Sequence, residues 1–134
     1  MTGKIYFAGL LTLAALGAAG VFASWWIVTV APYRGARFTP EDWAAVWACD
    51  GLSAPDCEMQ RAACPRGPML RDLRARLRSG LTTETEVTAL LGPGNGAGPG
   101  CLQWPLGICT PFSVDWTALT ACFDGVGRLT SLSP

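Results

Sequence analysis

The sequence predicts an α+β protein in which an N-terminal transmembrane helix precedes a helical hairpin and then two helices packed on a three-stranded antiparallel sheet. Three observations predict this order. A long uncharged segment opens the chain, six cysteines are spread over the remainder, and the last third combines helix caps with strand and turn motifs. The 134 residues suffice for one small domain with an appendage.

The opening segment has the length and composition of a membrane-spanning helix. Residues 5–31 carry no charge, and at about 1.5 Å per residue a helix of this length crosses a hydrocarbon core of roughly 30 Å. Tyr6 lies near one end, and Trp25 and Trp26 lie near the other. Aromatic residues at both interfaces are typical of an anchored transmembrane helix.

A cleaved signal peptide is the alternative, because Val21-Phe22-Ala23 offers a small-residue cleavage site. The apolar run continues beyond it to Val30, which favours a retained anchor over residues 1–33. The first cysteine is Cys49, so no cysteine for a lipid anchor lies near the start. The charges that flank the segment are nearly balanced, and the cysteines therefore decide the orientation, with the rest of the chain exported to the periplasmic side.

A helical hairpin is predicted for residues 34–65. Thr39 is a favourable N-cap, followed by a proline in the first turn and by two acids that the helix dipole favours. The first helix presents Trp43, Val46 and Trp47 on one face. Core packing explains this face, and contact with the bilayer interface is the alternative.

The second hairpin helix is expected from Ser53 or Ala54 to Cys64, before Pro65. The following helix, Met69–Arg78, places three leucines on one face. Beside them lies a basic stripe formed by Arg71, Arg74 and Arg78. A solvated helix face explains the stripe, and contact with anionic lipid headgroups or an acidic partner is the alternative.

The next helix begins with a capping box, because Thr83 is a good N-cap and Glu86 follows three positions later. Gly92 ends the helix. The glycine- and proline-rich run Gly92–Gly100 is expected to be a flexible loop and neither helix nor regular strand. Its side chains are all small, so it is interpreted as slack rather than as a recognition surface.

Strands are expected around Cys101–Leu106 and Trp116–Phe123, in a hairpin centred near residue 111 or 112. The turn Asp124–Gly127 then leads into a last strand. Trp104 and Trp116 are expected to pack in the core first and to bind second. Phe112 joins them as a candidate aromatic anchor for a partner.

The motifs Thr83–Gly92, Trp104–Gly107 and Phe123–Leu129, in this order, resemble the domain of the outer-membrane assembly factor BamE and its relatives, the small outer membrane protein A family. The resemblance covers residues 66–134 and implies a two-helix, three-strand unit. Two departures stand out: Gly80 lies one residue too far upstream, and Pro93 follows the glycine directly. The family's role implies an accessory scaffold that contacts lipid and partner proteins in the cell envelope.

The six cysteines predict structural disulfides rather than a redox or metal centre. None forms a Cys-x-x-Cys pair, and the chain has no histidine. In the expected hairpin Cys101 lies opposite Cys122, close enough to bridge. Cys49 with Cys57 and Cys64 with Cys109 would complete one of fifteen connectivities, but only the first pair has a geometric argument.

Composition and motifs predict a protein without catalysis, cofactor, metal or small-molecule substrate. The chain lacks histidine, and no set of nucleophile and base or phosphate-binding loop is present. A net charge of zero on an exported domain argues against nucleic acid.

We therefore expect a membrane-anchored scaffold that docks to envelope proteins. The alternative is a secreted inhibitor-like module, because the same helix–helix–meander unit resembles each half of the beta-lactamase inhibitory proteins. Retention of the N-terminal helix discriminates between the two. A thiol-redox protein is a third hypothesis, which would require a reactive free cysteine.

Overall fold

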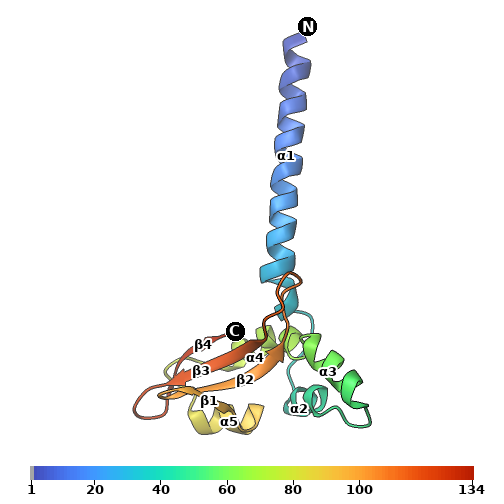
Figure 1. Ribbon diagram of the computed structural model, residues 1–134. Coiled ribbons are helices and arrows are strands. Elements are labelled where there is room, and N and C mark those ends of the chain that lie inside the picture. The colour runs from blue at the N-terminus through green and yellow to red at the C-terminus, as the bar shows by residue number, and fades with distance from the viewer. Residues whose placement is uncertain (1) are drawn as a thin grey trace.

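The computed structural model describes residues 2–134, with side chains from residue 12 onward. The helices are α1 (Thr2–Thr29), α2 (Pro40–Ala48), α3 (Ala54–Ala62), α4 (Leu70–Arg76) and α5 (Glu84–Leu91), with 3-10 turns η1 (Ala31–Tyr33) and η2 (Gly67–Met69). The strands are β1 (Asn95–Gly98), β2 (Cys101–Gly107), β3 (Thr117–Phe123) and β4 (Leu129–Ser133). Figure 1 shows α1 rising alone from a domain that holds all the other elements. The α+β class is confirmed.

The sheet has four strands in the order β1-β2-β3-β4, so the expectation of three strands is wrong. The additional strand, β1, lies within Gly92–Gly100, the run expected to be a flexible loop. Its backbone pairs with β2, Asn95 opposite Gln103, although all four of its residues are exposed. An edge strand can form through backbone hydrogen bonds alone, so its sequence carries no hydrophobic alternation.

Trp104 explains why glycines precede this strand. Its indole Nε1–H donates a hydrogen bond to the Gly92 carbonyl oxygen at 3.0 Å, and its ring lies under Gly94. A Cβ atom at Gly94 would lie 2.9 Å from the Trp104 ring. The glycine segment is thus packed over a core side chain and is not slack.

Local helix signals are confirmed, with shifts at the helix ends. Thr39 caps α2, and Thr83 forms the predicted capping box with Glu86 at α5. The helix expected over Met69–Arg78 is shorter, because Met69 belongs to η2 and the extended backbone of Leu77 ends α4. In the Asp124–Gly127 turn, the Asp124 carboxylate accepts two backbone N–H groups.

One hydrophobic core joins the hairpin segment 34–65 to the rest of the domain. Phe38 and Trp43 from that segment are fully buried together with leucines of α4 and alternate residues of β2 and β3. The core-facing strand residues are Trp104, Leu106, Leu119, Ala121 and Phe123. The alternation means that the helices cover one face of the sheet, while the other face carries polar and small side chains.

Three disulfides staple this small domain, and all six cysteines take part in them. They join Cys49 to Cys57, Cys64 to Cys109, and Cys101 to Cys122. Cys101 and Cys122 are direct cross-strand partners, as the predicted register required. These are the three pairings assembled from the sequence, and they leave no thiol for the redox hypothesis.

Candidate binding surfaces

The turn η1 (Ala31–Tyr33), which directly follows α1 and forms its foot, is packed tightly against the domain. Gly67 lies where a Cβ atom would meet the Cys64 sulfur and would be 2.6 Å from the Pro32 carbonyl oxygen. Four residues after Pro32, the Ala36 N–H donates to the Pro68 carbonyl oxygen at 3.3 Å. Since the domain begins within a few residues of the end of the helix, a bilayer crossed by α1 would lie directly against this end of the domain.

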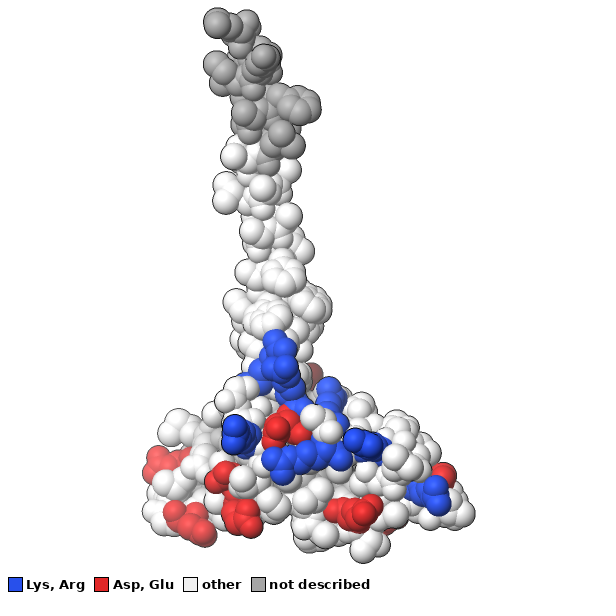
Figure 2. Space-filling model, turned by 180° about the vertical axis from the view of Figure 1, so that it is seen from behind, with Lys and Arg blue, Asp and Glu red and all other residues white. Residues whose placement is uncertain are grey.

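A basic pocket lies at this junction, between the end of α1 and α4. It has a volume of about 330 Å³ and is lined by Trp26, Thr29, Val30, Tyr33, Arg34, Arg71 and Arg74. The Arg34 guanidinium lies 4.9 Å from the centre of the Trp26 ring. Figure 2 shows basic side chains gathered where the helix meets the domain. The arrangement suits a phosphate group at the depth of lipid headgroups.

Asp72 lies next to this pocket, but its charge is already neutralised. Its carboxylate accepts the Phe38 N–H at 2.9 Å and pairs with Arg76 at 2.8 Å. The Phe38 hydrogen bond and then the Arg76 charge hold the pKa of Asp72 below its usual range. Arg76–Asp72 is the one ion pair among the described side chains, so Arg71 and Arg74 have no carboxylate within ion-pair distance.

The other binding residues predicted from the sequence lie in different parts of the structure. Arg78 lies beyond the end of α4 and does not line the basic pocket. Trp104 is buried in the core, whereas Trp116 is 53% exposed and contacts Trp47 edge-on, with ring centres 6.3 Å apart. Phe112 is 86% exposed in the β2–β3 loop, residues 108–116. Of the arginine and aromatic candidates, only Arg71 and Arg74 line the same pocket.

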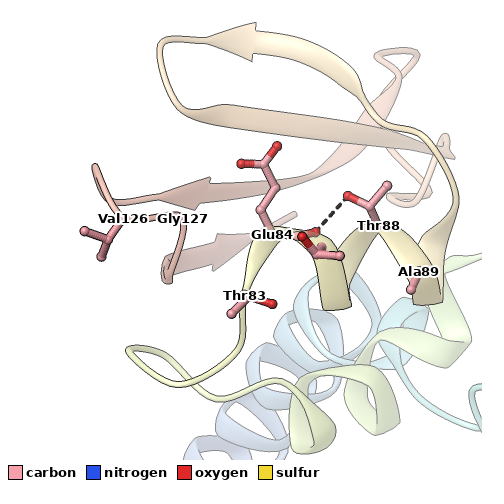
Figure 3. Close-up of a pocket in the computed structure, with 7 residues that line it drawn as sticks. Thr83, Glu84, Thr88, Ala89, Val126 and Gly127 are labelled. Atoms are coloured by element: carbon pink, nitrogen blue, oxygen red, sulfur yellow. Dashed lines mark hydrogen bonds between the residues drawn. The ribbon is translucent and has the colours of Figure 1, made fainter.

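A shallow groove of about 700 Å³ lies along α5 and the β3–β4 turn. Its lining residues are Thr83, Glu84, Thr85, Thr88, Ala89, Val126 and Gly127. Figure 3 shows Glu84 and Thr88 on α5, with Val126 and Gly127 across from them, and the Thr88 hydroxyl donates to the Glu84 carbonyl oxygen at 2.8 Å. Figure 1 places α5 at the end of the domain away from α1.

The groove was missed in the sequence because its residues were explained as cap and turn. Val126, which is 78% exposed in the turn, is the signal that could have found it. The lining offers hydroxyls, methyl groups and the single carboxylate of Glu84, a set suited to binding rather than to acid–base or nucleophilic chemistry.

Arg66 is a second feature that the sequence did not reveal. Its side chain is buried, and it donates to the Trp43 carbonyl oxygen at 3.0 Å and to the Pro105 carbonyl oxygen at 3.3 Å. Burial, and then the nearby charge of Arg61, lowers the pKa of Arg66 to about 10. Arg66 therefore ties the hairpin to the sheet.

Within the described part of the chain, no group of three or more acidic or cysteine side chains is placed to hold a metal ion. One helix, with a span at Thr12–Tyr33, is long and apolar enough to cross a membrane, a property that it shares with signal sequences. Together with the disulfides, this helix indicates export from the cytoplasm.

Comparison with protein-family models, with curated proteins and with solved structures finds no match to this chain.

Proposed function

We propose that this chain is a membrane-anchored, non-catalytic binding module that holds a partner protein close to the bilayer on the periplasmic side. The observation that carries the proposal is the exposed apolar segment that continues past the possible cleavage site before Ser24. Trp25 and Ile27 are each 52% exposed, and removal of residues 1–23 would leave both side chains in water. This segment thus favours a retained anchor.

In this proposal the two ends of the domain bind different partners. The basic pocket of Arg34, Arg71 and Arg74 faces the anionic lipid headgroups. The α5 groove, at the opposite end, receives a segment of an envelope protein. Glu84 is the only charged side chain of that groove, so a segment carrying a lysine or arginine suits it best.

The resemblance to the BamE family supports the same role. In the domain, α4 and α5 are followed by β2, β3 and β4 in the order that the motifs predict, with β1 added at the edge. The absence of histidine and the engagement of every cysteine in a disulfide support a role without chemistry. The inhibitor-like module stays the alternative, and it is favoured only if the helix is removed.

Two measurements test the proposal. The first is the intact mass of protein purified from membranes, alkylated with and without prior reduction. We expect the full-length mass, with six cysteines that react only after reduction. A mass that starts at Ser24 would instead support the released inhibitor-like module, and free thiols on the full-length chain would contradict export.

The second measurement is photo-crosslinking in intact cells, with p-benzoyl-phenylalanine replacing Thr85 in the groove. We expect one discrete crosslinked protein, and we expect Glu84→Lys to abolish it because the substitution reverses the charge of the groove. The same crosslinker at Met59, exposed on α3 outside the groove, is the control. Equal capture from both positions would contradict the groove as the docking surface.

A further inference from the structure

We propose that the β2–β3 loop inserts its tip into the membrane interface beside α1, as a second anchor of the domain. The occupant of this apolar surface is then the lipid bilayer itself. The inference rests on the proposed membrane anchoring and deepens it, because it concerns a surface that the anchoring alone does not require.

The root of the loop is fixed against the end of α3. The Ile108 N–H donates to the Ala62 carbonyl oxygen at 3.0 Å, and Cys109 is bridged to Cys64. Gly107, where the loop leaves β2, has a φ of 108°, and a Cβ atom there would lie 2.7 Å from the Cys64 backbone nitrogen. The loop therefore leaves the sheet in one fixed direction.

That direction brings the loop to the depth of the membrane helix. A pocket of about 420 Å³ is lined on one side by Ile27 of α1 with Ala31 and Pro32 of η1, and on the other by residues 108–111 of the loop, while Ala63, Cys64 and Pro68 complete the lining. Ile27 lies within the segment that is apolar enough to span a membrane. Figure 1 shows the loop rising to the lower end of α1.

The tip of the loop is apolar and exposed. Phe112 and Val114 are each 86% exposed, more than any other large hydrophobic side chain for which exposure is described. Single exposed hydrophobic residues are ordinary on a protein surface. Two at one loop tip, next to a helix of membrane-spanning character, instead indicate a surface that lipid covers.

The loop has a shape that holds this tip outward. The Ser113 N–H donates to the Thr110 carbonyl oxygen at 3.3 Å, and the Ser113 hydroxyl accepts the Asp115 N–H at 3.0 Å. These bonds satisfy backbone groups within the loop, which lowers the cost of placing it in the interface. Asp115 is the one charged residue of the loop, next to Trp116 on the side that returns to β3.

The basic pocket lies on the other side of the same foot. The loop stands in front of the end of α1 in Figure 1, and the basic side chains come into view in the reverse view of Figure 2. Headgroup phosphates held on one side and apolar side chains inserted on the other would seat the domain flat on the membrane.

Site-specific photo-crosslinking of the full chain in phospholipid nanodiscs tests this inference. p-Benzoyl-phenylalanine replaces Phe112 at the loop tip, Phe22 on α1 as the positive control, or Val126 in the β3–β4 turn as the exposed negative control. Mass spectrometry then counts covalent lipid adducts, and intact mass confirms that each variant is full length with its six cysteines oxidised. We expect adducts from positions 112 and 22 and only background from 126.

Adducts at position 22 with none at 112 would overturn the insertion of the loop while the anchoring stands. An absence at both positions would overturn the anchoring and the inference together. Equal labelling at positions 112 and 126 would also overturn the insertion of the loop, because such labelling would show contact with lipid unrelated to the loop. A tenfold excess of 112 over 126 is the expected margin.

Discussion

The guanidinium of Arg66 lies 4.6 Å from the centre of the Trp43 ring and also donates to the Trp43 carbonyl oxygen, so one buried cation holds both the side chain and the backbone of α2. Its second bond reaches Pro105 in β2. The hairpin and the sheet are thus joined by a residue that has no acidic partner among the described side chains.

Arg66→Lys should destabilise the domain by about 2–3 kcal/mol. A lysine ammonium cannot reach both carbonyl oxygens in the geometry of the planar guanidinium, and an unsatisfied buried acceptor costs roughly 1–3 kcal/mol. Urea unfolding followed by tryptophan fluorescence measures the loss. Arg71→Lys, at an exposed position on α4, is the control and should change the stability by less than about 0.5 kcal/mol. Equal stabilities of the two variants would contradict the role of Arg66.

Gly67→Ala should destabilise the junction by about 1–3 kcal/mol, because the added methyl group would overlap the Cys64 sulfur and the Pro32 carbonyl oxygen. Thermal unfolding by circular dichroism measures the effect. Gly125→Ala is the matched control, since a Cβ atom there meets nothing within 4 Å. If Gly67→Ala were as stable as Gly125→Ala, the foot of α1 would be looser than described.

Asp72 should make the domain more sensitive to acid. Its folded-state pKa lies below the ordinary value of 3.8, so its stabilising contribution is fully present above that value and is lost as the pH falls through the folded-state pKa. We expect Asp72→Asn to be less stable than the wild type at neutral pH and nearly equal to it at the acidic end. Urea unfolding at a series of pH values measures the difference. A constant difference across the series would contradict this assignment.

Removal of the Cys64–Cys109 bridge should cost more stability than removal of the Cys49–Cys57 bridge. The two bridges have sequence separations of 45 and 8 residues. The chain-entropy relation then gives about 4 and about 2.5 kcal/mol, respectively. Paired substitutions to serine leave no free thiol, and chemical unfolding compares the two variants. The reverse order would show that local packing, rather than loop length, dominates.

Arg71→Gln combined with Arg74→Gln should weaken the preference for anionic lipid about thirtyfold, at about 1 kcal/mol for each lost charge near the surface. Native mass spectrometry of the full chain with phosphatidylglycerol against phosphatidylcholine measures this preference. Arg78→Gln with Arg128→Gln removes the same charge outside the basic pocket and should leave the preference intact. An equal loss in both double variants would mean that net charge alone attracts the lipid.

Sequence reasoning succeeded where neighbouring residues determine the structure. The hydroxyls of Thr39 and Thr83 accept backbone N–H groups only three positions away, and the register of the β2–β3 hairpin placed Cys101 opposite Cys122. It failed where the structure depends on contacts between residues that lie far apart in the sequence. The glycine segment that leads into β1 packs over Trp104, and Arg66 is buried by partners 23 and 39 positions away.

The candidate site was predictable only in part, for the same reason. The sequence singled out Arg71 and Arg74 on α4, but not their meeting with Arg34 and Trp26 from the end of α1. Phe112 was singled out as an anchor for a protein partner. The position of its loop near the end of α1 follows from the Cys64–Cys109 bridge and from Gly107, which only the folded chain brings together.

The close fit of Gly67 against Pro32 also bears on how the membrane and the α5 groove are related. If this junction holds α1 and the domain as one body, a change in the tilt of the helix swings the groove through the same angle. Helix tilt responds to the thickness of the bilayer. The direction in which this protein offers its groove would therefore depend on the membrane in which it stands.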